Sequence, residues 1–369
     1  MAFLLFLFHF FVDWASSFPA PLGPYFVKQY GLDTRTVSMA ITALGFLGSL
    51  AQPVFALLLS RVTNHLLSLY VSLSLVALSV VFLSLPLSFA LLFGTFLMLF
   101  LANASFHPLG AALSGMRGGA QGVAFFTAGG IAGGVVGPLC VTFFALRSSL
   151  AWVSWIALGL WVLLSLGFLR FRKVSLRVPH VAFSFELFLA LFPVWLLVGI
   201  RTFFTSLFHA FLPLYVASFA PLFWGGLLLS LGVLVGFFAN FLGVALLKKT
   251  PIWVVNFLSF IGLGVGLLFL PVARSIPLLL FLSLSADFSA FLTMSANVHE
   301  AQEILPEHRV FASSVAMGLA WSFGNLLSLV FSSFFGNRVT FVLETSGILG
   351  ILVAGVLLLV RPRPVGRVR

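Results

Sequence analysis

Long apolar runs alternate with short polar breaks along almost the whole chain. A run of about 20 apolar residues is long enough to cross a bilayer as an α-helix, and a span with its connection takes roughly 30 residues. Charged residues, prolines and small polar clusters separate the runs. The pattern predicts an all-α polytopic membrane protein with twelve transmembrane helices, at residues 3–27, 36–60, 65–85, 87–108, 121–145, 149–169, 185–216, 221–247, 251–271, 276–296, 309–335 and 339–360.

The composition excludes the soluble alternatives. Hydrophobic residues make up 61% of the 369 positions and charged residues only 7%, and the mean hydropathy is +1.20. Soluble domains carry roughly 25% charged residues, so this chain could not cover a water-facing surface. A soluble enzyme, a secreted domain and a disordered protein are excluded. The single cysteine, Cys140, permits no intramolecular disulfide.

The first apolar run is predicted to be a retained span. It begins at Met1 without a basic region, carries His9 and Asp13, and lacks a small-residue cleavage site, so it does not resemble a signal peptide.

The basic residues predict the orientation. Twelve spans place both termini on one side, and that side carries 13 of the 19 Lys and Arg residues, against 5 on the other side and Arg201 within a span. Because cytoplasmic loops are enriched in Lys and Arg, both termini are predicted to be cytoplasmic, in a multi-pass protein of the cell inner membrane. The net charge of +11 then faces anionic lipid, and no basic soluble domain exists that would bind nucleic acid.

A basic central connection divides the chain into two halves. The predicted organisation is a six-helix bundle at 1–169, a basic cytoplasmic linker at 170–184, a second six-helix bundle at 185–361 and a basic tail at 362–369. Two such halves are typical of secondary transporters built from repeats.

A charge at the bilayer centre costs roughly 2.5–3.5 kcal/mol, so ionisable residues inside the predicted spans are candidates for a functional site. Six of them are singled out on spans 1, 4, 7 and 10, which are the helices expected to line the central cavity of a twelve-helix transporter. They are His9, Asp13, His107, Arg201, His209 and Asp287.

His9 and Asp13 are spaced four residues apart and so share one helix face. Asp13 lies near mid-depth, where a carboxyl group that binds and releases a proton would suit proton coupling, assisted by His9 and His107. A buried Asp held by a hydrogen bond or ion pair between helices is the alternative. Asn103 and His107 also share a face, and His107 is either a relay or ligand residue or a hydrogen-bonded packing residue.

Arg201 lies midway along span 7, with Thr205 and His209 on a broad common face. Its planar guanidinium suits carboxylate or phosphate oxygens, so a substrate-binding role is one interpretation and a structural ion pair with Asp13 or Asp287 is the other. The candidate substrate-binding set is Arg201, Thr205, His209, Asn103 and Asp287.

No metal site, catalytic motif or nucleotide-binding loop is evident. The sequence HEAQEILPEH at 299–308 is not a zinc-binding HExxH motif and is better explained as a solvated loop. The chain lacks a P-loop, a GxSxG motif and a dinucleotide fingerprint, so it is predicted to be neither an enzyme nor an ATP-driven pump, and to need no cofactor.

Small residues follow one face of span 5. Gly129, Gly133 and Gly137 recur every fourth residue, and Pro138 follows. Such a stripe lets helix backbones approach closely. Tight packing of two helices is one interpretation of the stripe. A second, compatible interpretation is that the close contact lets one helix rock on the other during transport.

The span 5 pattern resembles the antiporter motif of the major facilitator superfamily. Within that superfamily the chain is most similar to the fosmidomycin-resistance group of efflux transporters. The matching segments are His9-x3-Asp13, Gln52-Pro53-Val54, Asn103 to Pro108, Arg201-Thr202, Phe211 to Tyr215 and Glu303 to Pro306. In the loop after span 2, which helps set the inward/outward balance in this family, Arg61 is retained. Ser60 and Thr63 replace the family's acid and glycine.

The resemblance implies two six-helix bundles, alternating access and proton-driven export of a small molecule, anionic or amphiphilic. The expected partners are this substrate, protons and the lipid bilayer, and the chain is predicted to be a monomer. An importer or facilitator of the same fold is the main alternative, followed by a receptor or assembly protein that transports nothing.

Overall fold

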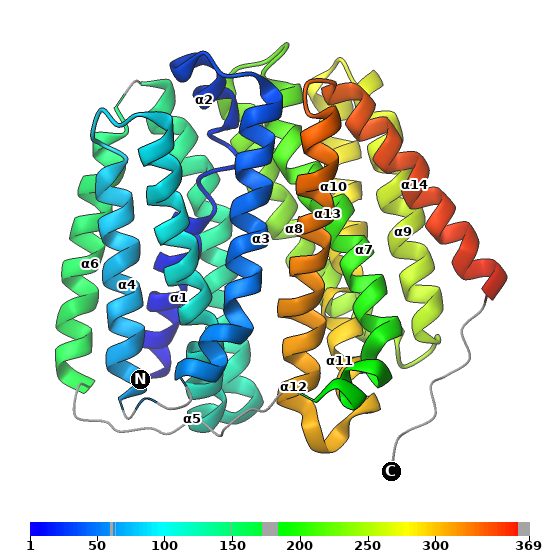
Figure 1. Ribbon diagram of the computed structural model, residues 1–369, viewed down its shortest axis with the longest axis horizontal. Coiled ribbons are helices and arrows are strands. Elements are labelled where there is room, and N and C mark those ends of the chain that lie inside the picture. Colours follow the sequence, from blue (N-terminus) through cyan, green and yellow to red (C-terminus); the bar gives the residue numbers. More distant parts are fainter. Residues whose placement is uncertain (60–61, 63, 148, 172–183, 361–369) are drawn as a thin grey trace. The chain divides into compact units, whose positions relative to one another are not determined.

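The computed structural model describes residues 1–59, 62, 64–147, 149–171 and 184–360, and within these ranges the regular structure is entirely helical (Figure 1). The α-helices are α1 (Ala2–Ser16), α2 (Gly23–Tyr30), α3 (Thr34–Leu59), α4 (His65–Phe82), α5 (Phe89–Leu146), α6 (Ala151–Phe171), α7 (Phe185–Val216), α8 (Leu222–Leu246), α9 (Ile252–Phe269), α10 (Ile276–Leu292), α11 (Met294–Ile304), α12 (Arg309–Ser314), α13 (Ala320–Phe335) and α14 (Val339–Val360). Short 3-10 turns at Leu270–Val272 and Pro306–His308 and a π-helical turn at Val315–Leu319 join some of them.

Eleven helical segments of the described chain are long and apolar enough to cross a membrane, and α1 is a twelfth, shorter apolar helix. Together they account for the twelve predicted spans. Residues 172–183 of the predicted linker and the predicted tail at 362–369 lie outside the described residues.

The first helix is shorter than the span predicted at 3–27. It ends at Ser16, and α2 begins only at Gly23. Pro19 and Pro21 fall between the two helices. Proline has no backbone N–H and disfavours the helical conformation of the residue before it, so the helix cannot continue through this segment.

The 58-residue helix α5 contains two spans, Phe89–Ser114 and Gly122–Leu146. A Cβ atom added at Gly122 would collide with the carbonyl oxygen of Ser114. Residues eight apart in a straight helix lie about 12 Å apart, so the chain reverses direction between the spans. The first span runs past Pro108, where the sequence predicted its end.

The described chain forms two compact units. Unit 1 comprises Met1–Leu32 and Leu47–Ala182, and unit 2 comprises Asp33–Phe46 and Phe183–Arg369, in each case as far as these ranges are described. Helix α3 therefore contributes its first part to unit 2 and its second part to unit 1.

Unit 1 is built around α1, which packs against both spans of α5 and also against α4 and α6. Eight side chains of this short helix are buried, among them Phe8, Phe11 and Trp14. The core of unit 1 therefore surrounds the helix that carries two of the six ionisable residues.

Unit 2 is built around α7, which contacts α8, α10, α11, α13 and α14, while α9 packs against α14 and α10. Two buried amides, Asn256 and Asn297, join α9 to α11 by reciprocal hydrogen bonds of 3.1 and 3.0 Å. Such polar pairs hold helices together in an apolar environment, where exposed polar groups would lose their partners.

The start of α3 is held by hydrogen bonds within unit 2. The Asp33 carboxylate accepts from the backbone N–H of Thr36 at 2.8 Å and from Asn337 Nδ2 at 3.1 Å. Thr34 Oγ1 donates to the carbonyl of Gly336 at 2.9 Å. These donors lower the pKa of Asp33 to about 2, because hydrogen bonds to a carboxylate favour its charged form.

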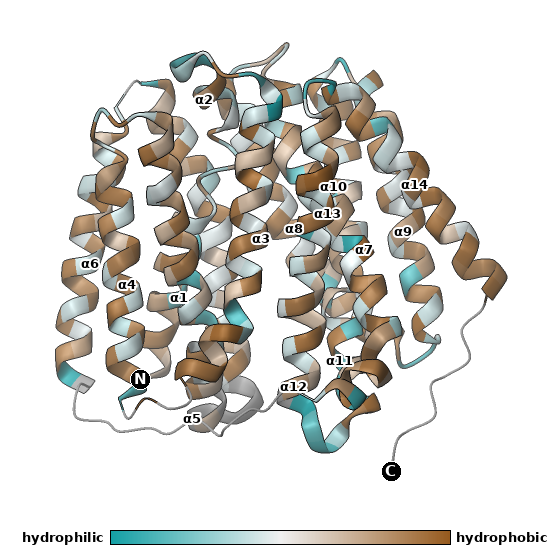
Figure 2. Ribbon diagram, in the orientation of Figure 1, coloured by the Kyte–Doolittle hydropathy of each residue, from teal (hydrophilic) through white to brown (hydrophobic). Residues whose placement is uncertain are grey.

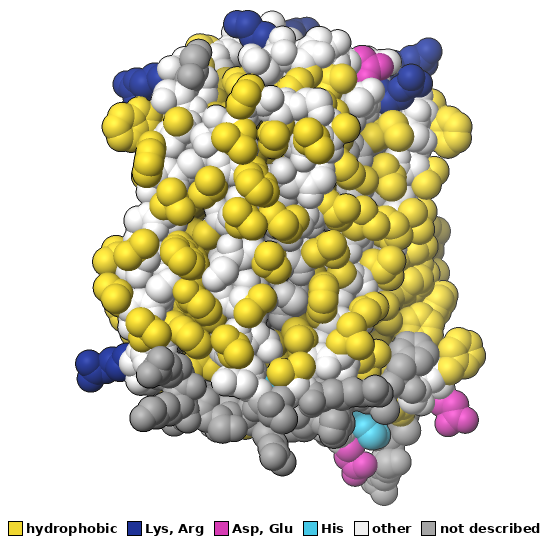
Figure 3. Space-filling view, turned by 60° about the vertical axis from the view of Figure 1, so that its left-hand side comes forward, with side chains coloured by type: hydrophobic (Ala, Val, Ile, Leu, Met, Phe, Trp, Pro, Cys, Tyr) yellow, Lys and Arg dark blue, Asp and Glu magenta, His cyan; other side chains and the backbone are white. Residues whose placement is uncertain are grey.

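The surface matches a bilayer-spanning protein. Figure 2 shows helices that are hydrophobic along most of their length. On the face in Figure 3, hydrophobic side chains fill a broad middle band, and Lys and Arg side chains lie towards its two ends. Many large apolar side chains are exposed, including Phe238, Phe281 and Phe334. Contiguous apolar surface of this extent is unfavourable in water and fits contact with lipid.

Candidate functional site

Helix α1 presents His9 and Asp13 on one face, as their spacing predicted. His9 Nε2 lies 3.1 Å from Asp13 Oδ2. The histidine is buried, whereas the Asp13 side chain is 26% exposed. The acid is therefore enclosed on one side and accessible on the other.

The first span of α5 adds two more side chains to this face. His107 Nε2 lies 3.3 Å from Asp13 Oδ1 and 3.1 Å from His9 Nε2. Asn103 Nδ2 donates to Ser16 Oγ at 2.7 Å and lies 3.4 Å from Asp13 Oδ1. Asn103, predicted among the substrate-binding residues, thus lies beside the predicted coupling residues. We call His9, Asp13 and His107 the unit 1 triad.

Hydrogen bonds to backbone carbonyls orient both imidazole rings. His9 Nδ1 lies 2.8 Å from the carbonyl oxygen of Phe126, and His107 Nδ1 lies 3.0 Å from that of Asn103. A carbonyl oxygen only accepts, so each Nδ1 carries the hydrogen. In the neutral rings, each Nε2 then has a lone pair, and both lone pairs point towards the carboxylate.

The unit 1 triad therefore brings two imidazole Nε2 acceptors together with both oxygens of one carboxylate, and no hydrogen-bond donor of the triad lies between them. Lone pairs 3.1 Å apart beside a carboxylate repel one another unless a positive charge joins them. A proton shared within the triad, or a metal ion bound at its centre, would supply that charge. The three ligand atoms lie within 4.8 Å of one another, and the described residues contain no second group of three such side chains that could hold a metal ion.

Gly130, on the second span of α5, lies beside the triad. A Cβ atom added there would lie 2.5 Å from Asp13 Oδ2 and 2.5 Å from His9 Nε2. Any larger residue at this position would occupy the space beside these two atoms.

The predicted glycine stripe lies directly on α1. A Cβ atom at Gly129, Gly133 or Gly137 would collide, respectively, with the carbonyl of Phe6, the carbonyl of Phe10 or Ser17 Oγ. The absence of side chains lets the two backbones touch, as expected for a small-residue stripe. Pro138 follows within α5. Arg61, predicted to belong to the conformational motif, lies outside the described residues.

Unit 2 brings together His209 of α7 and Asp287 of α10. His209 Nε2 lies 2.7 Å from Asp287 Oδ1. Asp287 is completely buried, and its Oδ2 has no hydrogen-bond partner. Gly232 of α8 lies so close that a Cβ atom there would collide with Asp287 Oδ2.

Arg201 does not join this pair. Its Nη1 donates to the carbonyl of Ala290 at 3.1 Å, and its buried Nε has no partner. Within the described part of unit 2, no carboxylate pairs with it, because Asp287 is engaged by His209. Thr205 Oγ1 hydrogen-bonds to the backbone of its own helix, to the carbonyls of Arg201 and Thr202. Arg201 is thus a buried cation without an acidic partner there.

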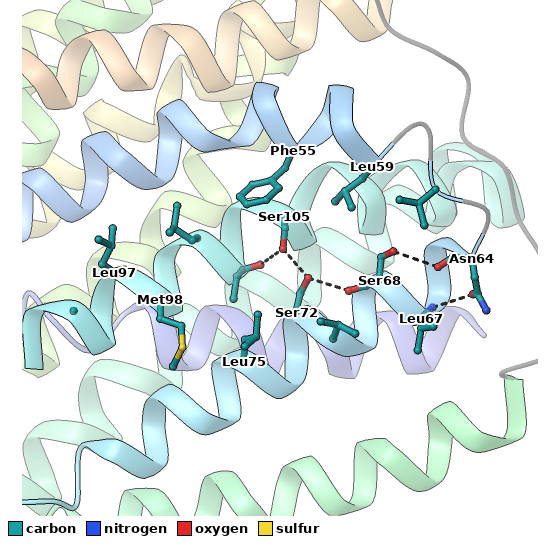
Figure 4. A pocket seen from close by; sticks show the side chains of 15 residues that line it. Phe55, Leu59, Asn64, Leu67, Ser68, Ser72, Leu75, Leu97, Met98 and Ser105 are labelled. Carbon is teal, nitrogen blue, oxygen red and sulfur yellow. Dashed lines mark hydrogen bonds between the residues drawn. The ribbon is translucent and has the colours of Figure 1, made fainter. Parts of the chain in front are cut away.

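A separate cavity of about 710 Å³ lies in unit 1 among α3, α4 and α5 (Figure 4). Its wall is mostly apolar, with Phe55, Leu75 and Met98 among the lining residues. The hydroxyls of Ser72 and Ser105 bond to each other at 2.6 Å. None of the predicted site residues lines this cavity, which is suited to an apolar group.

Sequence reasoning found Gly130 in the span 5 motif but not its place beside Asp13, and it missed Gly232 and the carbonyl of Phe126. Gly130 neighbours the recognised stripe, but its spacing does not distinguish it from the packing glycines. Gly232 sits in a glycine-rich apolar span without any motif. Every residue has a backbone carbonyl, so the sequence cannot indicate which one orients His9. Only the packing of α5 on α1 shows that it is the carbonyl of Phe126.

The comparisons with known proteins agree with this architecture. The family model described as Major Facilitator Superfamily matches residues 5–324, and the chain belongs to this superfamily. No curated protein matches the sequence. The protein is accordingly a membrane transporter by family and fold, not an enzyme.

Solved transporters share the fold at low sequence identity. A POT family transporter in complex with 5-aminolevulinic acid is 15% identical, with a TM-score of 0.79 over 97% of this chain and 95% of that chain. A bacterial homologue of the human lysosomal transporter Spinster is 13% identical, with a TM-score of 0.70 over 97% and 94%. A mutant of the nucleoside transporter NupG is 16% identical, with a TM-score of 0.73 over 96% and 99%. Identity this low supports the fold alone.

Proposed function

We propose that the protein is a proton-coupled secondary transporter of the inner membrane, with cytoplasmic termini, that exports a small anionic or amphiphilic molecule by alternating access. The unit 1 triad is its coupling site. The observation that carries the proposal is the convergence of Asp13 and two imidazole Nε2 atoms on one point that requires a positive charge. Such a point on apolar helices is costly to maintain unless it binds a cation.

Arg201 is the proposed contact for an anionic group of the substrate. It is buried, it lacks an acidic partner within the described part of unit 2, and its Nε is unsatisfied. A buried charge without a partner is strongly unfavourable, and a substrate carboxylate or phosphate would compensate it. Thr205, His209, Asn103 and Asp287 complete the proposed substrate-binding set.

Export is inferred from the sequence resemblance to the fosmidomycin-resistance group and from the span 5 stripe. The direct contact of Gly129, Gly133 and Gly137 with α1 supports a helix pair that rocks during transport. The apolar cavity among α3, α4 and α5 of unit 1 would by itself accept an apolar group.

The decisive experiment uses proteoliposomes with an imposed pH gradient. A substrate is first identified by thermal shift among small anions and amphiphiles. Asp13→Asn should abolish accumulation of that substrate against its gradient and leave substrate exchange measurable, because the carboxyl group carries the cation and not the substrate. Accumulation by the mutant would refute the assignment.

The direction of transport is tested by reversing the pH gradient across the same vesicles. Antiport requires that substrate moves opposite to the proton in both orientations of the gradient. Movement in the same direction as the proton would make the protein an importer of the same fold.

The matched control for the loss of an acid in Asp13→Asn is Glu307→Gln, at an exposed position on Pro306–His308.

A further inference from the structure

We propose that His9, Asp13 and His107 form a binding site for a divalent transition-metal ion of the zinc type. The inference deepens the proposed function, since it concerns the same coupling site, but metal binding is measurable without transport. It rests on the positions of the three ligand atoms, on the orientation of the rings and on the space beside Gly130.

The ligand atoms lie close to the spacing of a tetrahedral site. Zinc binds nitrogen and carboxylate oxygen at about 2.0–2.2 Å, which places neighbouring ligands of a tetrahedron roughly 3.3–3.5 Å apart. In the unit 1 triad the two Nε2 atoms lie 3.1 Å apart, and the carboxylate places Oδ2 at 3.1 Å from His9 Nε2 and Oδ1 at 3.3 Å from His107 Nε2. One ligand atom from each residue lies within 4.8 Å of the others, so a rotation of the Asp13 carboxylate would bring one oxygen to the third corner of the site.

The rings are held in the form that binds a metal. A metal-binding histidine usually donates its second ring N–H to a carbonyl or carboxylate, which fixes the tautomer and the ring orientation. His9 donates to the Phe126 carbonyl and His107 to the Asn103 carbonyl. Both Nε2 lone pairs are thereby directed at Asp13, and neither ring must turn to bind.

Three protein ligands would leave the fourth position of a tetrahedral ion to water or to another ligand. Gly130 faces Asp13 Oδ2 and His9 Nε2, and a side chain there would fill the adjoining space. Asp13 and His107 are 26% and 29% exposed, so an ion has a route to the triad. Three protein ligands with an open fourth position is the arrangement of zinc sites that exchange a ligand.

The ligand types select the metal. Two imidazoles favour Zn²⁺, Co²⁺, Ni²⁺ and Cu²⁺, whereas Mg²⁺ and Ca²⁺ prefer all-oxygen sites with more ligands. A bound zinc ion would occupy the atoms assigned to the coupling proton. We therefore expect zinc to inhibit transport driven by the pH gradient, and Mg²⁺ or Ca²⁺ to leave it unchanged.

The test is Co²⁺ absorption spectroscopy on the tag-free, chelator-stripped full chain in detergent. Tetrahedral Co²⁺ gives intense visible bands, and hydrated octahedral Co²⁺ gives weak ones. We expect one equivalent of tetrahedral Co²⁺, displaced by Zn²⁺ and not by Mg²⁺. Asp13→Asn and His107→Gln should each weaken binding by more than the roughly 10–100-fold that loss of an outer-shell partner costs.

Two further variants separate this site from adventitious binding. Gly130→Ala retains all three ligands and should still weaken binding, because the added methyl group occupies the space next to two of them. His308→Gln removes an exposed histidine of unit 2 and should bind like the wild type. If Asp13→Asn does not give a monodisperse protein, the Co²⁺ affinity of His107→Gln alone decides whether the triad binds the metal.

The outcomes distinguish the two proposals. Octahedral Co²⁺ only, or equal affinity in the wild type and both ligand variants, overturns the metal site. Gradient-driven transport without metal binding overturns the metal site alone. Metal binding lost in the ligand variants, in a protein that shows no gradient-driven transport, upholds the site and overturns the proposed coupling.

Discussion

Each of the two units encloses an aspartate that is bonded to histidine and lies against a glycine. The two acids differ in the number of their partners and in their exposure. Asp13 has two histidines and Asn103 close to its two oxygens, and its side chain is partly exposed. Asp287 has His209 alone, is completely buried, and leaves Oδ2 without a partner. The first arrangement leaves the acid partly accessible, whereas the second encloses it completely.

The comparison separates an accessible acid with several neighbours from a buried acid that depends on one partner. Partial exposure lowers the cost of changing the charge at Asp13, since solvent or substrate can reach it. Complete burial raises that cost at Asp287, because no water replaces a lost partner. Variants of the two units should therefore differ in stability in a predictable order.

The largest expected difference is between the histidine variants. His209→Leu removes the sole partner of a fully buried carboxylate and should cost about 3–5 kcal/mol of stability, the range for breaking a buried ion pair. His107→Leu leaves Asp13 with His9 and should cost about 1 kcal/mol, as for one hydrogen bond. Thermal unfolding in detergent measures both. Equal losses would contradict the contrast between the sites.

A second comparison uses the two glycines. In Gly232→Ala the new methyl group collides with the buried Asp287 side chain, and overpacking of this kind costs typically 1–3 kcal/mol. Gly130→Ala should cost less, because its methyl group overlaps less with Asp13 and His9 than the Gly232 methyl group does with Asp287, and Asp13 is partly exposed. The unfolding temperatures of the two variants test the order, with Gly94→Ala as control, since nothing lies within 4 Å of a Cβ atom there.

Arg201→Met should remove the stabilisation by anionic ligands without destabilising the free protein. Methionine keeps the side chain long and removes a buried charge. The free energy of unfolding should therefore stay the same or rise by up to about 1–4 kcal/mol, and the unfolding temperature should follow it. Protection by anionic ligands should disappear. A large destabilisation, with ligand protection retained, would mean that the guanidinium serves packing alone.

The smallest effect is expected at Asp33, which lies at the start of α3 and is exposed to solvent. Its pKa in the folded state is lowered to about 2 from the ordinary value of 3.8. Its contribution is thus fully present above the ordinary pKa and is lost as the pH falls towards 2. Asp33→Asn should lower the unfolding temperature slightly at pH 7, and the difference from the wild type should shrink between pH 4 and 2. A difference independent of pH would refute this.

The pairings inside each site show where sequence reasoning stops. The spacing of His9 and Asp13 placed both on one helix face, and the scarcity of charge drew attention to His107, Arg201 and Asp287. Spacing within one helix cannot say which face another helix presents. The sequence therefore left open whether Arg201 pairs with an acid. The structure of unit 2 shows Asp287 bonded to His209, 78 positions away along the chain.

Hydrophobicity by itself determined the fold class, because every backbone polar group in a bilayer must be satisfied within a helix and twelve apolar runs leave little choice. Proline placement was readable in principle, yet the end of α1 at Ser16 was not predicted. Only tertiary structure decided that a carbonyl from Phe126 orients His9, and that Gly130 leaves the space beside Asp13. Such features depend on how helices far apart in the sequence pack together, and the residue types alone do not determine that packing.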